Sequence, residues 1–120
     1  RTIAYLQQAL SGVPVNGTAH NVFSGFPLDQ VPIAAKTGTA EVDGKQTTSW
    51  FASFAPANAP RYAVVFMVSQ GGTGAGTSGP SVRAVYESLF GIDGSKVDPA
   101  RSVLRGGAPA RSLPRVGQDR

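Results

Sequence analysis

Apolar residues recur at helical spacing at the start of the chain. Within the first ten residues they follow the i, i+3, i+4, i+7 pattern of one helix face, at Ile3, Ala4, Leu6 and Leu10. We therefore expect a helix over Thr2–Leu10. Gly12 and Pro14 break the pattern, so this helix should stop near Ser11–Pro14.

Three extended segments follow a connecting stretch that is punctuated by glycine and proline. An Asp43-Gly44 pair between two of these segments is a strong hairpin signal. A second turn is expected at the proline-flanked residues 56–60. The pattern therefore predicts three antiparallel strands, at residues 31–42, 47–55 and 62–69.

The third strand is apolar at nearly every position of Tyr62–Val68. Because side chains alternate across a strand, both faces of the sheet must be covered. A flexible Gly/Ser/Thr loop is expected over Gln70–Gly79. An amphipathic helix should then begin at Pro80 and end at Gly91, at the positions where proline and glycine are favoured.

The predicted architecture is an α/β protein of the α+β type: helix, three antiparallel strands, helix and tail. Two helices can cover one face of such a sheet, which leaves the other face and one edge open. We therefore expect residues 1–92 to be an incomplete part of a domain, with the missing half N-terminal to Arg1. Residues 93–120, rich in Pro, Gly and Arg, are expected to be a disordered tail.

Charge and composition exclude several classes of function. The net charge of +4 divides into +1 for residues 1–92 and +3 for residues 93–120, so half of the cations lie in the tail. That distribution does not predict a nucleic-acid surface. No cysteine is present, which excludes disulfides and thiolate metal sites, and no metal or cofactor site is expected. Neither a membrane-spanning segment nor a signal peptide is visible.

The segment Lys36-Thr37-Gly38-Thr39 has the chemistry of an anion site. Lys36 supplies positive potential, and the Thr37 hydroxyl can donate a hydrogen bond to a carboxylate. Gly38 leaves room for a ligand against a strand. The backbone N–H of Thr39 can donate to the oxyanion of an acyl-transfer intermediate. On a strand, Thr37 and Thr39 project to the same side, so both hydroxyls can face one ligand.

Lys-Thr-Gly is also the third signature motif of serine β-lactamases and penicillin-binding proteins. Over residues 1–92 the chain resembles the class B penicillin-binding proteins, particularly the elongation type. The resemblance rests on an ordered series of segments with strand, turn and helix in the expected order: Gly17-Thr18-Ala19, Ala35 to Glu41, Ser49 to Pro56 and Tyr62 to Val68.

This resemblance implies the C-terminal part of a penicillin-binding/β-lactamase-like transpeptidase fold, in which the strands join a five-stranded sheet. It implies a D,D-transpeptidase that crosslinks peptidoglycan through a serine acyl-enzyme and is inhibited by β-lactams. Lys36 and Thr39 would then be catalytic, and Lys36, Thr37, Gly38 and Thr39 would bind the substrate. The implied partners are peptidoglycan stem peptides, β-lactam antibiotics and a cell-wall elongation complex. The implied protein is anchored in the cytoplasmic membrane by an N-terminal helix, with its catalytic domain outside.

Two features depart from the family pattern. Ala35 stands where family members usually have Gly, and its single methyl group is small enough for activity to survive. No serine in the sequence is followed three residues later by Lys, and no S-x-N occurs. The nucleophile and the second motif are therefore expected upstream, on the N-terminal remainder of the same protein, and this chain alone should be inactive.

Other residues are assigned structural roles. We expect His20 on the surface, Glu41 as a strand-end charge, and Trp50 and Phe51 on opposite faces of the sheet; Arg61 and Arg83 have no partner identifiable from sequence. The main functional alternative is a β-lactam sensor or degenerate penicillin-recognising module without turnover. A division-specific or bifunctional class A enzyme, and an unrelated small β-domain with a fortuitous motif, also stay open.

Overall fold

The computed structural model describes residues 1–70 and 72–103, apart from the side chain of Val42. Helix α1 precedes an antiparallel sheet with the strand order β1-β2-β3, and a π-helical turn, η1, leads into helix α2 and a short hairpin. In chain order the elements are α1 (Thr2–Asn16), β1 (Ala34–Val42), β2 (Lys45–Ala55), β3 (Tyr62–Val68), η1 (Gly74–Ser78), α2 (Gly79–Phe90), β4 (Ile92–Asp93) and β5 (Lys96–Val97).

Helix α1 extends beyond the predicted stop, and the expected end near Ser11–Pro14 is wrong. Pro14 lies inside the helix and is buried, while the Ser11 hydroxyl donates to the Gln7 carbonyl at 2.6 Å. Proline removes one N–H, but it interrupts a helix only where packing does not compensate. The helix ends instead at Gly17, whose N–H donates to the Val13 carbonyl. A Cβ on Gly17 would lie 2.8 Å from Val13 Cα, which explains the need for glycine there.

The predicted hairpin is confirmed. Strands β1 and β2 pair from Ala34–Phe54 to Val42–Lys45, and Gly44 takes the positive φ of 66° that the tight turn requires. Strand β1 begins three residues later than predicted. Val31 and Ile33, which fall within the predicted strand, are buried in the core ahead of β1.

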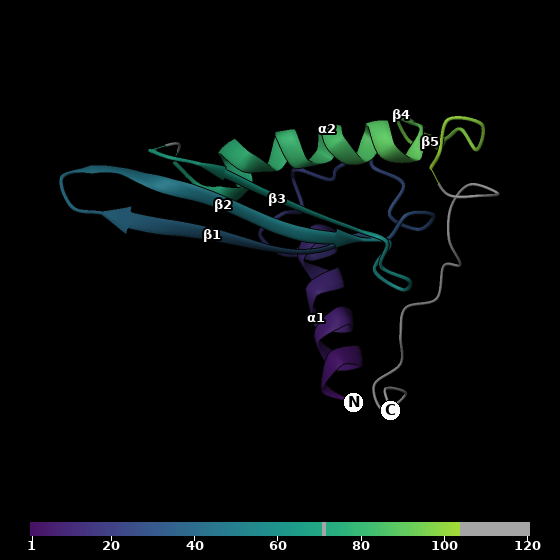
Figure 1. Cartoon of the computed structure of the whole chain (residues 1–120), viewed down its shortest axis with the longest axis horizontal. Helices are drawn as coiled ribbons and strands as arrows, with labels where there is room; N and C mark the ends of the chain where they lie inside the picture. Colours follow the sequence, from purple (N-terminus) through teal and green to yellow (C-terminus); the bar gives the residue numbers. More distant parts are fainter. Residues whose placement is uncertain (71, 104–120) are drawn as a thin grey trace.

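Helix α2 lies along one face of the sheet, and the hydrophobic core lies between them (Figure 1). The core includes the fully buried rings of Phe51, Tyr86 and Phe90, and the last two stack with centroids 6.0 Å apart. Each such side chain stabilises the fold by roughly 1.5–3 kcal/mol relative to an exposed one. As predicted, proline stands at the start of α2, and Gly91 ends it with φ of 63°.

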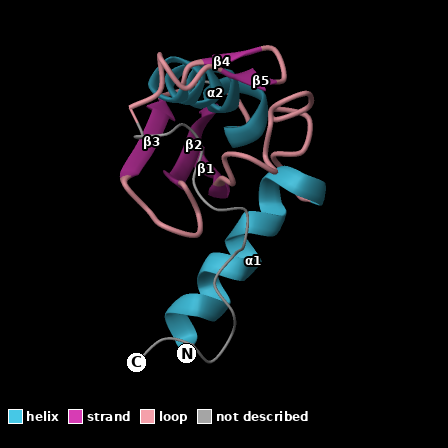
Figure 2. Ribbon diagram, turned by 90° about the vertical axis from the view of Figure 1, so that its right-hand side faces the viewer, coloured by secondary structure: helices cyan, strands magenta, loops and turns pink. Residues whose placement is uncertain are grey.

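The opposite face of the sheet is only partly covered. Helix α1 packs against β1 and projects away from the sheet (Figure 2). A hollow of about 180 Å³ between Leu10 and the sheet is lined on the sheet side by residues that include Lys36, Phe54 and Val65. Farther along, Trp50, Val65 and Met67 are 41%, 60% and 48% exposed. The expected apolar face is therefore present. The two helices contact opposite faces of the sheet, whereas the sequence pattern predicts both on one face.

The segment after β3 is more structured than predicted. The expected flexible loop Gln70–Gly79 contains the turn η1, in which Gly74 and Ser78 are buried. The tail prediction also differs from the structure at its first residues. Strands β4 and β5 form a hairpin, and the backbone N–H of Val103 donates to the Leu89 carbonyl of α2. Most of the predicted tail, residues 104–120, lies outside the described residues.

Candidate functional site

The Lys36–Thr39 segment lies in the middle of β1, at one edge of the three-stranded sheet. Its four residues pair in order with Ala52, Phe51, Trp50 and Ser49 of β2. Within the described residues, the other side of the β1 backbone pairs with no strand. An edge strand presents unpaired N–H and C=O groups to a ligand or a further strand.

Thr37 and Thr39 lie on the same side of β1, as alternation predicted. Their pairing partners Phe51 and Ser49 are both fully buried beneath α2, which identifies the shared side as the α2 side. Lys36 belongs to the opposite side. Its ammonium donates to the backbone carbonyl of Thr37 at 2.7 Å, so the long side chain stays close to the strand.

Both threonine hydroxyls have partners within the chain. Thr37 Oγ1 lies 2.7 Å from Thr18 Oγ1, which belongs to the loop after α1. Thr39 Oγ1 accepts a hydrogen bond from the backbone N–H of Gly74 at 3.4 Å. The Gly17-Thr18-Ala19 sequence pointed to family resemblance but not to this contact. The candidate site therefore includes Thr18 and Gly74, which no sequence pattern links to it.

Gly74 makes the closest backbone approach in this region. A Cβ at this position would lie 2.3 Å from the Trp50 carbonyl oxygen and 2.7 Å from that of Gly38. Gly38 itself is not crowded within the chain, since its Cβ would meet Trp50 Cβ at an ordinary 3.5 Å. Glycine is therefore needed at position 74 for internal packing, whereas no contact within the described chain requires glycine at position 38.

Hydroxyl groups anchor the segment after β3 to β2. Ser49 Oγ donates to the Thr73 carbonyl at 2.8 Å and lies 2.6 Å from Ser78 Oγ, and both serines are fully buried. Thr47 Oγ1 also donates to the Gly72 carbonyl at 2.9 Å. These contacts fix the position of Gly74 beside Thr39.

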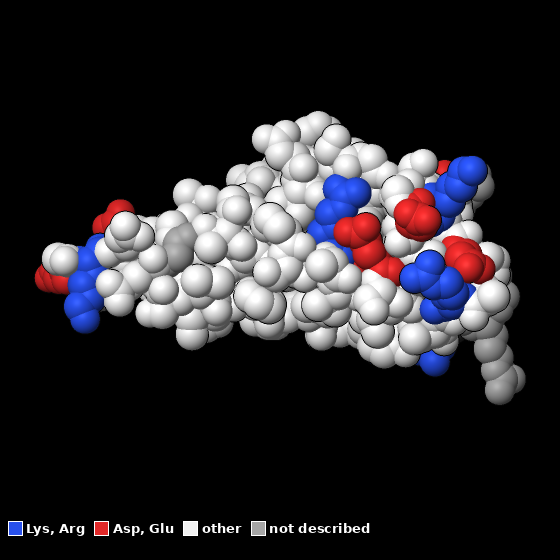
Figure 3. All heavy atoms as spheres, turned by 90° about the horizontal axis from the view of Figure 1, so that it is seen from above, with Lys and Arg blue, Asp and Glu red and all other residues white. Residues whose placement is uncertain are grey.

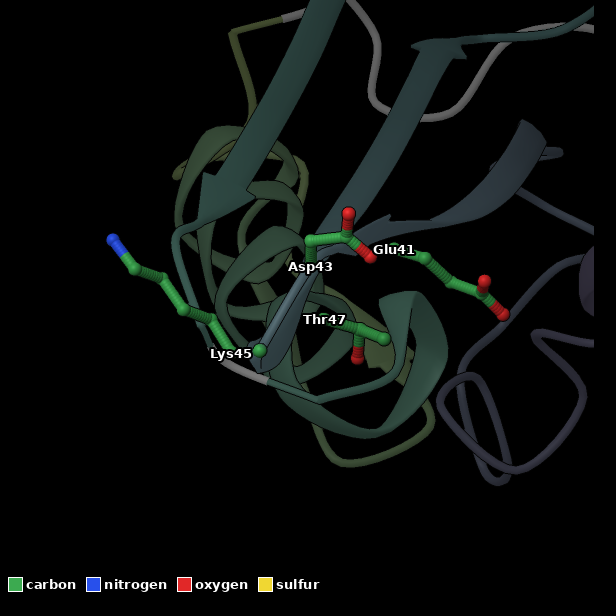
Figure 4. A pocket seen from close by; sticks show the side chains of 5 residues that line it. Glu41, Asp43, Lys45 and Thr47 are labelled. Carbon is green, nitrogen blue, oxygen red and sulfur yellow. The ribbon is translucent and has the colours of Figure 1, made fainter.

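The side chains around the β1–β2 turn do not form a comparable site. Glu41, Asp43, Lys45 and Thr47 line an open hollow there. In Figure 4, Lys45 and Glu41 point to opposite sides of the hairpin. Among the residues that the structure describes, no three His, Asp or Glu side chains gather into a metal-binding group. His20 is exposed, in agreement with its predicted surface position, and its Nδ1 contacts the Val15 carbonyl.

Charged side chains gather toward the two ends of the face seen in Figure 3, and the middle of that face is uncharged. Arg83 of α2 has partners that the sequence did not reveal. Its Nη1 donates to the backbone carbonyls of Val22 and Ser24, and its Nε contacts Glu87. Among the described helices, none is both long and apolar enough to cross a membrane.

Residues 1–87 match the family described as the penicillin binding protein transpeptidase domain. Because this match covers most of the chain, the protein belongs to that family. Together with the helices and antiparallel strands above, it confirms the predicted membership and fold class.

Relatives and solved structures agree with this assignment. The chain is 43% identical over 69 residues to the peptidoglycan D,D-transpeptidase PbpA of Mycobacterium tuberculosis, an alignment that covers 50% of this chain. It resembles Pseudomonas aeruginosa PBP2, solved with WCK 5153, at a TM-score of 0.59 and 32% identity over 79% of this chain. It also resembles the ceftriaxone acyl-enzyme of M. tuberculosis penicillin-binding protein A, at a TM-score of 0.57 and 32% identity over 70% of this chain.

The chain corresponds to only a small part of these proteins. It spans 14% of the length of the M. tuberculosis PbpA sequence, 19% of the P. aeruginosa chain and 20% of the acyl-enzyme chain.

Proposed function

We propose that this chain forms one wall of the active site of a peptidoglycan D,D-transpeptidase. The observation that supports this most directly is the position of Lys36–Thr39 on an edge strand, with the Thr37 and Thr39 hydroxyls on one side. The family match and the acyl-enzyme form of the M. tuberculosis relative support the same class of chemistry.

Each residue of the segment has a role in this proposal. The Thr37 hydroxyl binds the carboxylate at the end of a stem peptide, or the equivalent carboxylate of a β-lactam. Lys36 supplies positive potential to the same carboxylate; its side chain starts on the opposite side of β1, but its ammonium turns back to the Thr37 carbonyl. Gly38 leaves space for the ligand beside the strand, and the backbone N–H of Thr39 donates to the oxyanion as it develops. Lys36 and Thr39 thus act in catalysis, and all four residues bind the substrate.

The nucleophile belongs to another part of the same protein in this proposal. None of the serines in the printed sequence is followed three residues later by Lys. An upstream serine in an S-x-x-K motif attacks the carbonyl carbon, and the terminal D-Ala or the lactam nitrogen leaves from that carbon. The whole protein is anchored in the cytoplasmic membrane with its catalytic domain outside, where it works with cell-wall elongation proteins.

Covalent labelling of the complete protein tests this function. The protein is incubated with a fluorescent penicillin and digested, and the labelled peptide is identified by mass spectrometry. We expect the label on a serine outside these 120 residues, and no label after pretreatment with unlabelled penicillin. Label on a serine of this chain, or the absence of any label, would contradict the proposal.

A transfer assay separates an enzyme from a sensor. The complete protein is given a D-Ala-D-Ala stem peptide and an amine acceptor, and release of D-Ala is measured together with the crosslinked product. A transpeptidase forms both. A protein that is acylated by penicillin yet forms neither product would be a sensor or a degenerate module, which would contradict the proposed turnover.

A further inference from the structure

Thr18 presents its hydroxyl to Thr37 from a well-anchored loop. The two Oγ1 atoms lie 2.7 Å apart, within hydrogen-bond distance, although the residues belong to different elements. Thr18 itself is exposed, and Thr37 is half-buried at the middle of β1. The pair is therefore accessible to a ligand that lies along the strand.

The backbone around Thr18 is held on both sides. The N–H groups of Gly17 and Ala19 both donate to the Val13 carbonyl at the end of α1, at 3.1 and 3.3 Å. The Ala19 side chain is fully buried in the core. The N–H of His20 donates to the Gly17 carbonyl at 3.1 Å. These contacts hold the backbone of Thr18 in place and so limit the positions that its hydroxyl can take.

The direction of the hydrogen bond between Thr18 and Thr37 matters, because each hydroxyl group has only one proton to donate. A threonine hydroxyl has one proton to donate and two lone pairs that can accept. If Thr37 donates to Thr18, its only proton is used and cannot reach an anion. If Thr18 donates to Thr37, the Thr37 proton is left for a carboxylate, and the chain of hydrogen bonds polarises that proton further.

We propose that Thr18 is a positioning residue for substrate binding. It donates its hydroxyl proton to Thr37 Oγ1 and thereby directs the Thr37 proton to the carboxylate of the stem peptide or β-lactam. This role rests on the proposed function of Thr37. Thr18 touches neither the carboxylate nor the reacting atoms and acts through Thr37 alone.

The test compares Thr18→Val and Thr18→Ser in the complete protein, with acylation by a fluorescent penicillin followed over a range of concentrations. Thr18→Val keeps the side-chain shape and removes the donor, so the concentration for half-maximal acylation rate should rise about two- to tenfold, the effect of one hydrogen bond between neutral groups. The maximal acylation rate should change little. Thr18→Ser should restore most of the affinity.

Two further measurements distinguish this role from a structural one. In a Thr37→Val background, Thr18→Val should have no additional effect. The penicillin methyl ester, which lacks the carboxylate charge, should have almost the same inhibition constant in the wild type and in Thr18→Val. Thr48→Val is the matched control, since it removes a threonine hydroxyl from β2 at the position paired with Ala40. It should acylate like the wild type.

The outcomes separate the two proposals. An unlabelled wild-type protein would overturn the proposed function itself. If the wild type is labelled and Thr18→Val matches it, the positioning role is overturned. The same holds if the loss persists in the Thr37→Val background, or if it accompanies a lowered melting temperature and equal weakening of the ester.

Discussion

The backbone N–H of Gly74 donates to Thr39 Oγ1 at 3.4 Å and joins the segment after β3 to the middle of β1. This contact depends on the missing side chain of Gly74, because a Cβ there would lie 2.3 Å from the Trp50 carbonyl oxygen. The position of Thr39 is thus coupled to a turn that lies far from it in the sequence.

Replacement of Gly74 by alanine should impair acylation. The new methyl group must displace backbone atoms of β1 or β2, or force η1 away from Thr39. Removal of one oxyanion donor lowers the catalytic rate of an enzyme by about 10²–10³. We expect the acylation rate of Gly74→Ala to fall by an amount that approaches this range. Acylation of the complete protein by fluorescent penicillin measures it.

Gly12→Ala is the matched control for Gly74→Ala. Gly12 lies inside α1, where a Cβ would meet only Asn16 Oδ1 at 3.9 Å. This change should leave acylation unchanged and stabilise the helix by about 0.5–1 kcal/mol. Equal acylation rates in Gly74→Ala and Gly12→Ala would contradict the proposed coupling of η1 to Thr39.

Replacement of Lys36 by glutamine should weaken β-lactam binding. The ammonium is exposed beside the Thr37 carbonyl, and its removal takes away the positive potential near the bound carboxylate. A hydrogen bond to a charged group contributes about 1.5–3 kcal/mol, so affinity should fall by about ten- to a hundredfold. Concentration-dependent acylation checks this result, and Lys45→Gln at the hairpin is the matched control. Unchanged affinity in Lys36→Gln would remove Lys36 from the site.

Replacement of Arg83 by methionine should destabilise the fold. Its Nη1 donates to the Val22 and Ser24 carbonyls at 2.8 and 2.6 Å, which holds the loop before β1 against α2. Loss of hydrogen bonds from a charged donor should cost about 1.5–3 kcal/mol. Glu87→Gln removes only the i,i+4 ion pair and should cost at most about 0.5 kcal/mol. Thermal unfolding of the complete protein compares the stability of the two variants. Equal losses of stability in Arg83→Met and Glu87→Gln would show that the contacts of Arg83 with the loop contribute little.

The buried phenol of Tyr86 should make stability depend on alkaline pH. Burial raises the pKa of Tyr86 from 10.0 to about 12, while the hydrogen bond with Ser53 opposes the shift. Below pH 10 the phenol is protonated in both the folded and the unfolded state, so it adds no pH dependence. Between pH 10 and 12 the unfolded state releases its proton first, so the free energy of unfolding falls as pH rises.

Tyr86→Phe removes this titration. The variant loses the hydroxyl contact with Ser53 at 2.8 Å, which should cost about 0.5–1.5 kcal/mol at neutral pH. Ser53 keeps its bond to the Val64 carbonyl. Between pH 10 and 12 the melting temperature of the wild type should fall relative to that of the variant as pH rises. A constant difference across that range would contradict the raised pKa.

Several features of the fold could be predicted from residues that are close together in the sequence. Asp43-Gly44 predicted the hairpin because only glycine readily adopts the positive φ of its turn. Alternation along the strands placed Thr37 and Thr39 on one side and separated Trp50 from Phe51. The order of segments around Lys36–Thr39 also led to the family, which residues 1–87 confirm.

Local rules failed where packing outweighs propensity. Pro14 does not end α1, because the ring is buried and Gly17 supplies the actual stop. A glycine-rich composition suggested a flexible loop after β3, yet buried hydroxyls of Ser49 and Ser78 hold that segment against β2. A sequence pattern does not show how much surface a residue will bury.

The sequence by itself determined the strands, their turn and the Lys36–Thr39 motif, since these depend on periodicity and on residues that are adjacent in the chain. Only the tertiary structure decided which groups surround the motif. Thr18 and Thr37 are 19 positions apart, and Thr39 and Gly74 are 35 apart. Contacts over such distances arise from the packing of α1 and η1 against the sheet, and no local pattern encodes them.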